Sequence, residues 1–154
     1  MVSRAAADWE ALEEASAAKL DKAAGGWLGY EANSADQTGI TTSVALTGLS
    51  VTVTANTSRR LLILATGSVG CTATGYFRGR IRRDGSNIGT WISEDAAAAL
   101  SRTSATGFAL DAPSAGSHDY DLTLGRTSGT ATLDVIGTSP ENAKILVIDL
   151  GSVT

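Results

Sequence analysis

The chain has 154 residues, enough for about one domain, and its formal net charge at pH 7 is −4. This charge argues against general nucleic-acid binding, which depends on a strongly basic surface. Charged residues make up only 18% of the sequence, and Ser, Thr, Gly and Ala are abundant, a composition typical of turn-rich β proteins. The single cysteine, Cys71, excludes a disulfide within the chain, and we expect a small buried thiol there.

The first part of the chain carries the clearest helical pattern. Residues 3–24 are rich in Ala, contain neither Pro nor Gly, and end at Gly25-Gly26. A narrow apolar seam includes Trp9, Leu12 and Leu20. Since an isolated helix of this length is marginal in water, we expect the seam to pack on the chain's own domain, on an identical helix or on another protein.

The sequence divides into a helical anchor, residues 1–26, and a β-sandwich domain, residues 27–154. We interpret the aromatic segment 27–30 as an extended hinge between them, with Trp27 and Tyr30 as packing residues. The N-terminus has early acids and no continuous apolar run, so we expect neither a signal peptide nor a membrane span. We therefore expect synthesis in a reducing cytoplasm.

From Ile40 onward the hydrophobic period changes to two, as in half-buried strands. We expect turns at Thr47-Gly48, residues 55–58 and Asp84-Gly85, and a short helical or loop insertion within residues 94–102. Eight or nine strands at regular spacing favour a mainly β fold, an antiparallel jelly-roll-like sandwich. The expected strands beyond the central pair lie within residues 40–46, 49–53, 88–92, 106–110, 117–125, 130–137 and 143–150.

The central stretch, residues 59–84, is interpreted as two long strands joined by a turn near Gly67 to Gly70. Leu61 to Leu64 form an unbroken apolar run, which predicts a strand covered on both faces, in the centre of the sandwich or at a subunit contact. The C-terminal run at residues 145–150 has the same character.

A row of arginines is the most unusual local feature. Arg78, Arg80 and Arg82 repeat with the strand period and therefore point the same way. Asp119 and Asp121 share one face of a later strand and offer a matching acidic pair. One hypothesis is that the two strands meet across a sheet or a subunit boundary through bidentate ion pairs, and the alternative is a solvated edge.

Catalytic patterns are weak. The one histidine, His118, and the absence of a G-x-S-x-G sequence argue against a Ser-His-Asp or Cys-His device. His118 precedes Asp119 and Asp121, but a metal generally needs three or four convergent ligands, so a solvated turn residue is the favoured interpretation. No glycine cluster carries the ending of a phosphate loop. We expect no enzyme activity, no metal and no cofactor.

Several segments together resemble β-sandwich virion proteins of tailed phages that infect actinobacteria. They are the N-terminal helix, the Gly-Gly-Trp hinge, the run QTGITTSVALTGLSVTVTANTSRRLLILATG, the strand ending IRRDG and the terminal LVIDLG. Such proteins are minor tail, head-fibre or capsid-decoration proteins. The resemblance implies a jelly-roll or tumour-necrosis-factor-like body, often trimeric, displayed on a particle by an N-terminal anchor, and it transfers no catalytic residues.

Three functions remain open. A virion structural protein, trimeric and bound to other capsid or tail proteins through its N-terminal helix, explains a helix that needs a partner. It would have neither a nucleic-acid nor a membrane partner. A carbohydrate-binding or receptor-binding adhesin module would use the same fold but should expose aromatic residues in a groove. An enzyme fits least well.

Overall fold

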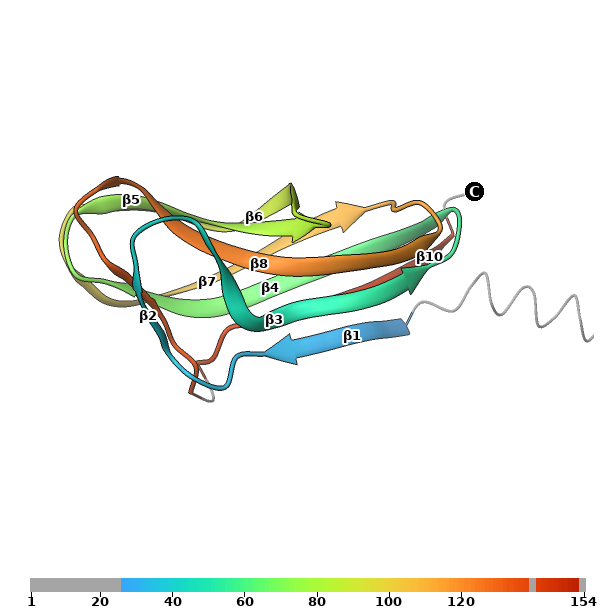
Figure 1. Cartoon of the computed structure of the whole chain (residues 1–154), viewed down its shortest axis with the longest axis horizontal. Helices are drawn as coiled ribbons and strands as arrows, with labels where there is room; N and C mark the ends of the chain where they lie inside the picture. The colour runs from blue at the N-terminus through green and yellow to red at the C-terminus, as the bar shows by residue number, and fades with distance from the viewer. Residues whose placement is uncertain (1–25, 139–140, 153–154) are drawn as a thin grey trace, which may run out of the picture.

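The computed structural model describes residues 26–138 and 141–152, which form two antiparallel β-sheets packed face to face (Figure 1). Strands, turns and loops account for all of these residues. The first sheet contains β1 (Gly26–Ala32), β10 (Lys144–Ser152), β4 (Arg59–Cys71), β7 (Leu100–Asp111) and the short strands β9 (Leu133–Val135) and β2 (Gln37–Ile40). The second contains β3 (Val44–Ala55), β8 (Gly116–Gly129), β5 (Gly75–Arg83) and β6 (Ser86–Ala96).

The long strands pair in a nested way. Strand β1 pairs with β10, β3 with β8, β4 with β7, and β5 with β6. The chain is thus arranged as one long hairpin whose successive strand pairs alternate between the two sheets. Pairing of β10 with β4 and of β8 with β5 then completes the four-strand orders β1-β10-β4-β7 and β3-β8-β5-β6.

The core lies between the sheets and follows the period of two. On β5, Phe77 and Ile81 are fully buried, whereas the arginines between and beside them face outward. Tyr120 and Leu122 of β8 and Leu61 of β4 fill the same layer. Burial of a large apolar side chain stabilises the fold by about 1.5–3 kcal/mol, so these inward positions dominate the stability.

The predicted turn at Gly67 to Gly70 is wrong. Strand β4 continues through these residues, because Gly67 pairs with Ala105 of β7 and Val69 pairs with Val135 of β9. The link to β5 lies at residues 72–74 instead. It connects strands in different sheets, so β4 and β5 do not form a hairpin.

Two further sequence interpretations are corrected. At Thr47-Gly48, strand β3 does not turn, since the positive φ of Gly48, 73°, accompanies a shift of register against β8. This is a β-bulge. Residues 94–102 form no helix, because β6 continues to Ala96 and β7 begins at Leu100; the loop that was the other expectation is present but limited to residues 97–99. The strand expected at residues 130–137 is limited to β9.

Two predicted turns are confirmed. Asp84 and Gly85 have φ values of 49° and 79° and close a two-residue hairpin in which Arg83 pairs with Ser86. Positive φ at both central residues defines the type I′ turn that suits the twist of the flanking strands. The expected turn after Ala55 is also present, with Ser58 at a φ of 62°.

The apolar runs are covered by the chain on one face only. Leu61 and Ile63 are buried, but Leu62 and Leu64 point to the other side of the sheet and are half-buried. The C-terminal run alternates in the same way, with Ile145 and Val147 inside. Coverage of both faces within the chain was therefore a wrong expectation, while coverage at a subunit contact stays a prediction.

The segment interpreted as a hinge is strand β1. It pairs with β10 along its length, with a bulge between Trp27 and Gly29. The interpretation of Trp27 and Tyr30 as packing residues is wrong for the chain by itself, since their exposed fractions are 73% and 46%. The two rings stack on each other, with centroids 6.2 Å apart. The predicted N-terminal helix and its seam of Trp9, Leu12 and Leu20 lie outside the described residues.

Candidate functional site

The arginine row lies on the outer face of the second sheet. Arg78, Arg80 and Arg82 are half-buried on β5 and point the same way, as the alternation predicts. Strand β5 pairs with β8 on one side and with β6 on the other. The central position of β5 places the three guanidinium groups in the middle of this face, away from the edges of the sheet.

Of the five residues in the ion-pair hypothesis, the structure joins one pair. Arg82 pairs directly with Asp121 across β5 and β8, and its Nε donates a hydrogen bond of 2.7 Å to Asp121 Oδ1. Its Nη2 contacts the other carboxylate oxygen, so the pair is bidentate. Asp119 instead accepts a 2.6 Å hydrogen bond from the hydroxyl of Thr52.

The other two arginines contact neutral groups. Arg78 Nε donates to the hydroxyl of Tyr76 over 3.1 Å, and the guanidinium lies 5.1 Å from the centre of that ring. Arg80 Nη1 donates to Thr90 Oγ1 over 3.0 Å. The pKa of Tyr76 is lowered, first by its hydrogen bond with Ser93 and then by Arg78, which stabilises the phenolate.

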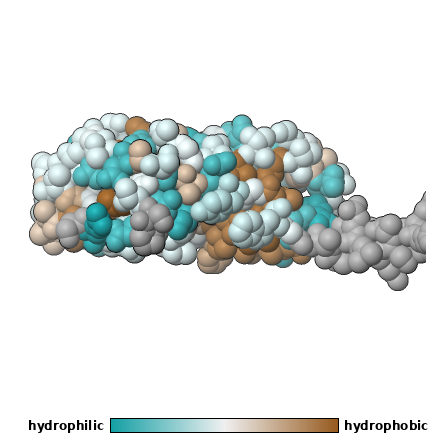
Figure 2. Space-filling view, turned by 90° about the horizontal axis from the view of Figure 1, so that it is seen from below, coloured by the Kyte–Doolittle hydropathy of each residue, from teal (hydrophilic) through white to brown (hydrophobic). Residues whose placement is uncertain are grey.

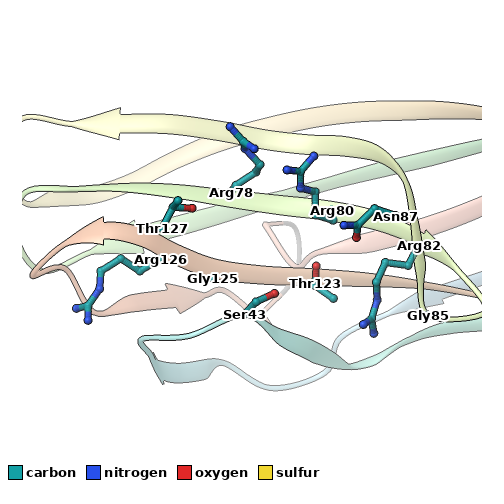
Figure 3. Close-up of a pocket in the computed structure, with 10 residues that line it drawn as sticks. All are labelled: Ser43, Arg78, Arg80, Arg82, Gly85, Asn87, Thr123, Gly125, Arg126 and Thr127. Atoms are coloured by element: carbon teal, nitrogen blue, oxygen red, sulfur yellow. The ribbon is translucent and has the colours of Figure 1, made fainter.

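A groove of about 390 Å³ runs over this face (Figure 3). Arg126 of β8 lies at its margin, with a side chain that extends away from Arg78 and Arg80 in Figure 3, and Arg126 Nη1 donates a 2.7 Å hydrogen bond to the carbonyl of Ala131. Hydroxyl and amide groups supply the remaining side-chain lining. The lining consists of Ser43, Arg78, Arg80, Arg82, Gly85, Asn87, Thr123, Gly125, Arg126 and Thr127.

The outer face of the first sheet is apolar. Two rows of side chains cross its four long strands from β1 through β10 and β4 to β7, because residues paired directly across antiparallel strands share a face. The rows are Trp27, Ile148, Leu62, Leu110 and Tyr30, Leu146, Leu64, Phe108.

Large side chains of these rows are exposed to solvent in the chain by itself. The exposed fractions are 63% for Phe108 and 55% for Leu110. Beside them lies a hollow of about 300 Å³ whose lining includes Tyr30, Leu64 and Leu146. Viewed from below, hydrophobic side chains gather along the β1 side of the sandwich (Figure 2). A soluble monomer rarely exposes so continuous an apolar face.

His118 belongs to neither surface. Its Nδ1 lies 2.7 Å from Asp84 Oδ2, and its Nε2 lies 3.0 Å from the carbonyl of Ser114. Hydrogen bonds to Asp84 and then to Ser114 raise the pKa of His118, since both partners accept from the protonated ring. Within the described ranges, no three His, Cys, Asp or Glu side chains are grouped as metal ligands.

Two simpler expectations concern Cys71 and membrane spans. Cys71 is buried, with its thiol 3.8 Å from the carbonyl of Ala98, so the predicted buried thiol is confirmed. In the part of the chain that the structure describes, no helix has the length and apolar character needed to cross a membrane.

The sequence alone predicted neither the full arginine-lined groove nor the apolar outer face of the first sheet. Ser43 and Asn87 line the groove beside the arginine row only because the residue before β3 and the start of β6 are brought to this face. For the apolar face, the small residues Gly107 and Ala109 were the available signal. They point inward, and a Cβ added at Gly107 would lie 2.3 Å from Trp91 Cα. This close approach forces the larger neighbours outward.

No protein-family model matches the chain, and no curated protein matches it. Solved structures that resemble it include a chain from the structure of infectious bursal disease virus Gx strain, with a TM-score of 0.38 and 10% sequence identity. The matched region covers 82% of this chain. It covers only 40% of the viral chain.

Proposed function

We propose that this protein is a structural component of a phage virion, displayed on the particle exterior as a capsid-decoration, head-fibre or minor tail protein, and that it acts by assembly. The observation that carries the proposal is the apolar outer face of the first sheet. A surface of this kind marks a contact with another protein. The order of features along the sequence supports a phage particle as the setting.

The proposed occupant of the apolar face is a further copy of the same chain, in a homotrimer. An aromatic side chain has about 150–250 Å² of surface, so Trp27, Tyr30 and Phe108 expose on the order of 400 Å². With the neighbouring leucines and isoleucine, the face approaches the roughly 800 Å² per partner of a standard interface. The exposed Phe108 ring and the nearby apolar hollow have the same apolar character, which favours self-association.

The strand order supports a jelly-roll architecture of the tumour-necrosis-factor-like kind. Four strand pairs are nested, first with last, and are divided over two four-strand layers. This is the arrangement expected when one long hairpin is rolled up, as in the double-sheet jelly rolls of viral capsid and lectin domains. Such a rigid body suits a protein whose role is display.

The proposed attachment to the particle is residues 1–26, through the seam of Trp9, Leu12 and Leu20. On this proposal the sandwich domain forms the trimer contacts, and the anchor binds other virion proteins. On this proposal the protein needs no catalytic residues and no cofactor, and its location is the virion.

Two measurements test the proposal. Size-exclusion chromatography with light scattering on the full chain should give three times the mass of the monomer. Gold-labelled antibodies against the purified protein should decorate the outside of intact particles in electron micrographs. A stable monomer at micromolar concentration would overturn the trimer, and particles without label would overturn the virion assignment.

A further inference from the structure

We infer that the arginine-lined groove on the second sheet binds an acidic oligosaccharide through its carboxylate or sulfate groups. This is a second surface, opposite the apolar face, and the inference goes beyond the proposed structural role. It is carried by the charges of the groove, by the chemistry of its walls and by its position on the sheet (Figure 3).

The first argument is charge. Asp121 neutralises Arg82 at one end of the groove. Arg78, Arg80 and Arg126 bind only neutral oxygens and form no ion pair with any carboxylate of the described residues. Each guanidinium has five N–H donors and uses one or two of them here, so donors remain for a ligand. Arg78 and Arg80 are therefore two like charges without a carboxylate partner on one face, which favours an anionic occupant.

The second argument is spacing. Alternate residues of a strand lie about 6.6 Å apart, so Arg78 and Arg80 can contact two acidic groups of one extended ligand. The guanidinium fork matches the geometry of carboxylate and sulfate oxygens. An extended chain with acidic groups on its sugar units can therefore place one group at each arginine.

The third argument is the chemistry of the walls. Ser43, Asn87 and Thr127 are exposed in the lining and offer hydroxyl and amide groups, which both donate and accept hydrogen bonds as sugar hydroxyls require. The lining holds no large apolar or aromatic side chain. It therefore offers nothing on which nucleic-acid bases could stack.

The fourth argument distinguishes a sugar chain from an acidic peptide. Peptides bind sheets by adding a strand at an edge or by placing apolar anchors in pockets. This groove lies over the face of β5 and β8, the two central strands of their sheet, whose hydrogen-bonding edges are already paired. An oligosaccharide lying across the face needs neither an edge nor an apolar pocket.

The test is isothermal titration of the full chain with three saccharide probes and with sodium sulfate. The saccharides are heparin-derived oligosaccharides, oligogalacturonates and, as the neutral control, maltooligosaccharides. Sodium sulfate alone distinguishes a saccharide site from a simple anion site. We expect binding of at least one acidic oligosaccharide and none of the neutral one. No binding of either acidic series, or sulfate binding as tight as the oligosaccharide, would overturn the inference.

A matched pair of double variants separates the groove from net charge. R78Q/R80Q should weaken binding by on the order of tenfold for each arginine removed, since charge-assisted hydrogen bonds are lost. R60Q/R102Q removes the same two charges from the first sheet and should leave the affinity unchanged. Equal losses in both variants contradict the groove as the site. Thermal melting of each variant verifies its fold, and a trimeric mass with no saccharide binding would reject this inference alone.

Discussion

The phenol of Tyr120 donates a 2.7 Å hydrogen bond to Asp111 Oδ2, which joins the second sheet to the end of β7 in the first. Arg83 Nη1 completes the contact, with distances of 2.7 and 2.9 Å to the two carboxylate oxygens of Asp111. Burial raises the pKa of Tyr120, as does the hydrogen bond to Asp111, so the phenol stays protonated as a donor. Three strands are fastened together at this end of the sandwich.

Tyr120→Phe is expected to lower the free energy of unfolding by about 1–2 kcal/mol, because the ring still fills the core but the hydrogen bond to a charged acceptor is lost. Urea denaturation measures the change. Tyr30→Phe is the control, since Tyr30 is an exposed tyrosine, and its effect should stay within about 0.5 kcal/mol. Equal effects of the two substitutions would show that the contact adds no stability.

Gly79 is expected to be sensitive to any side chain. A Cβ there would lie 2.3 Å from Trp91 Nε1, and this nitrogen donates a 3.0 Å hydrogen bond to the carbonyl of Thr123. Gly79→Ala should displace the indole and destabilise the fold by about 1–3 kcal/mol, as overpacking does. A red shift of tryptophan fluorescence and a lower urea midpoint measure this. Gly26→Ala meets no atom within 4 Å and should be near neutral.

The His118–Asp84 contact predicts a stability that depends on pH. Its hydrogen bonds raise the pKa of His118 above 6.5, so this stabilisation is complete below pH 6.5 and is lost as pH rises through the folded-state pKa. The hydrogen bond to His118 and then that from the Asp119 backbone lower the pKa of Asp84 below 3.8. This stabilisation is present above pH 3.8 and is lost as pH falls. The pair therefore contributes most between these values.

Asp84→Asn is the matched variant, because Asn-Gly also suits the type I′ turn. The difference in stability between the natural chain and Asp84→Asn should be largest between pH 3.8 and pH 6.5 and should shrink as pH rises through the folded-state pKa of His118. The pKa of His118, followed by NMR titration, should fall towards 6.5 in the variant. A His118 pKa unchanged by the substitution would contradict the assigned partner.

Phe108→Asp tests the apolar face without touching the core, because the ring points outward and is more than half exposed. In the proposed trimer the charge would be buried against apolar neighbours. The dissociation constant of the trimer should therefore rise at least about 100-fold. Analytical ultracentrifugation measures the dissociation. Thr54→Asp, an exposed position on β3 of the other sheet, is the control and should leave the trimer intact. An unchanged trimer in Phe108→Asp would place the interface elsewhere.

By itself, the sequence determined the strand character of much of the chain, the inward side of β5 and the turn at Asp84-Gly85. These features depend on local chemistry: alternation of apolar and polar side chains needs no knowledge of the partner strand, and positive φ selects its residues locally. The outward direction of Arg78, Arg80 and Arg82 followed from the same alternation.

Only the tertiary structure decided which strands pair and what covers each outer face. Gly67 to Gly70 suggested a turn, but pairing with β7 and β9 keeps them in a strand, because ladder hydrogen bonds from distant segments outweigh a weak local preference. The exposure of Trp27 and Phe108 could not be predicted either, since an apolar residue can pack equally well in the core or against another molecule. Burial is a property of the assembled sheets, which distant parts of the chain build together.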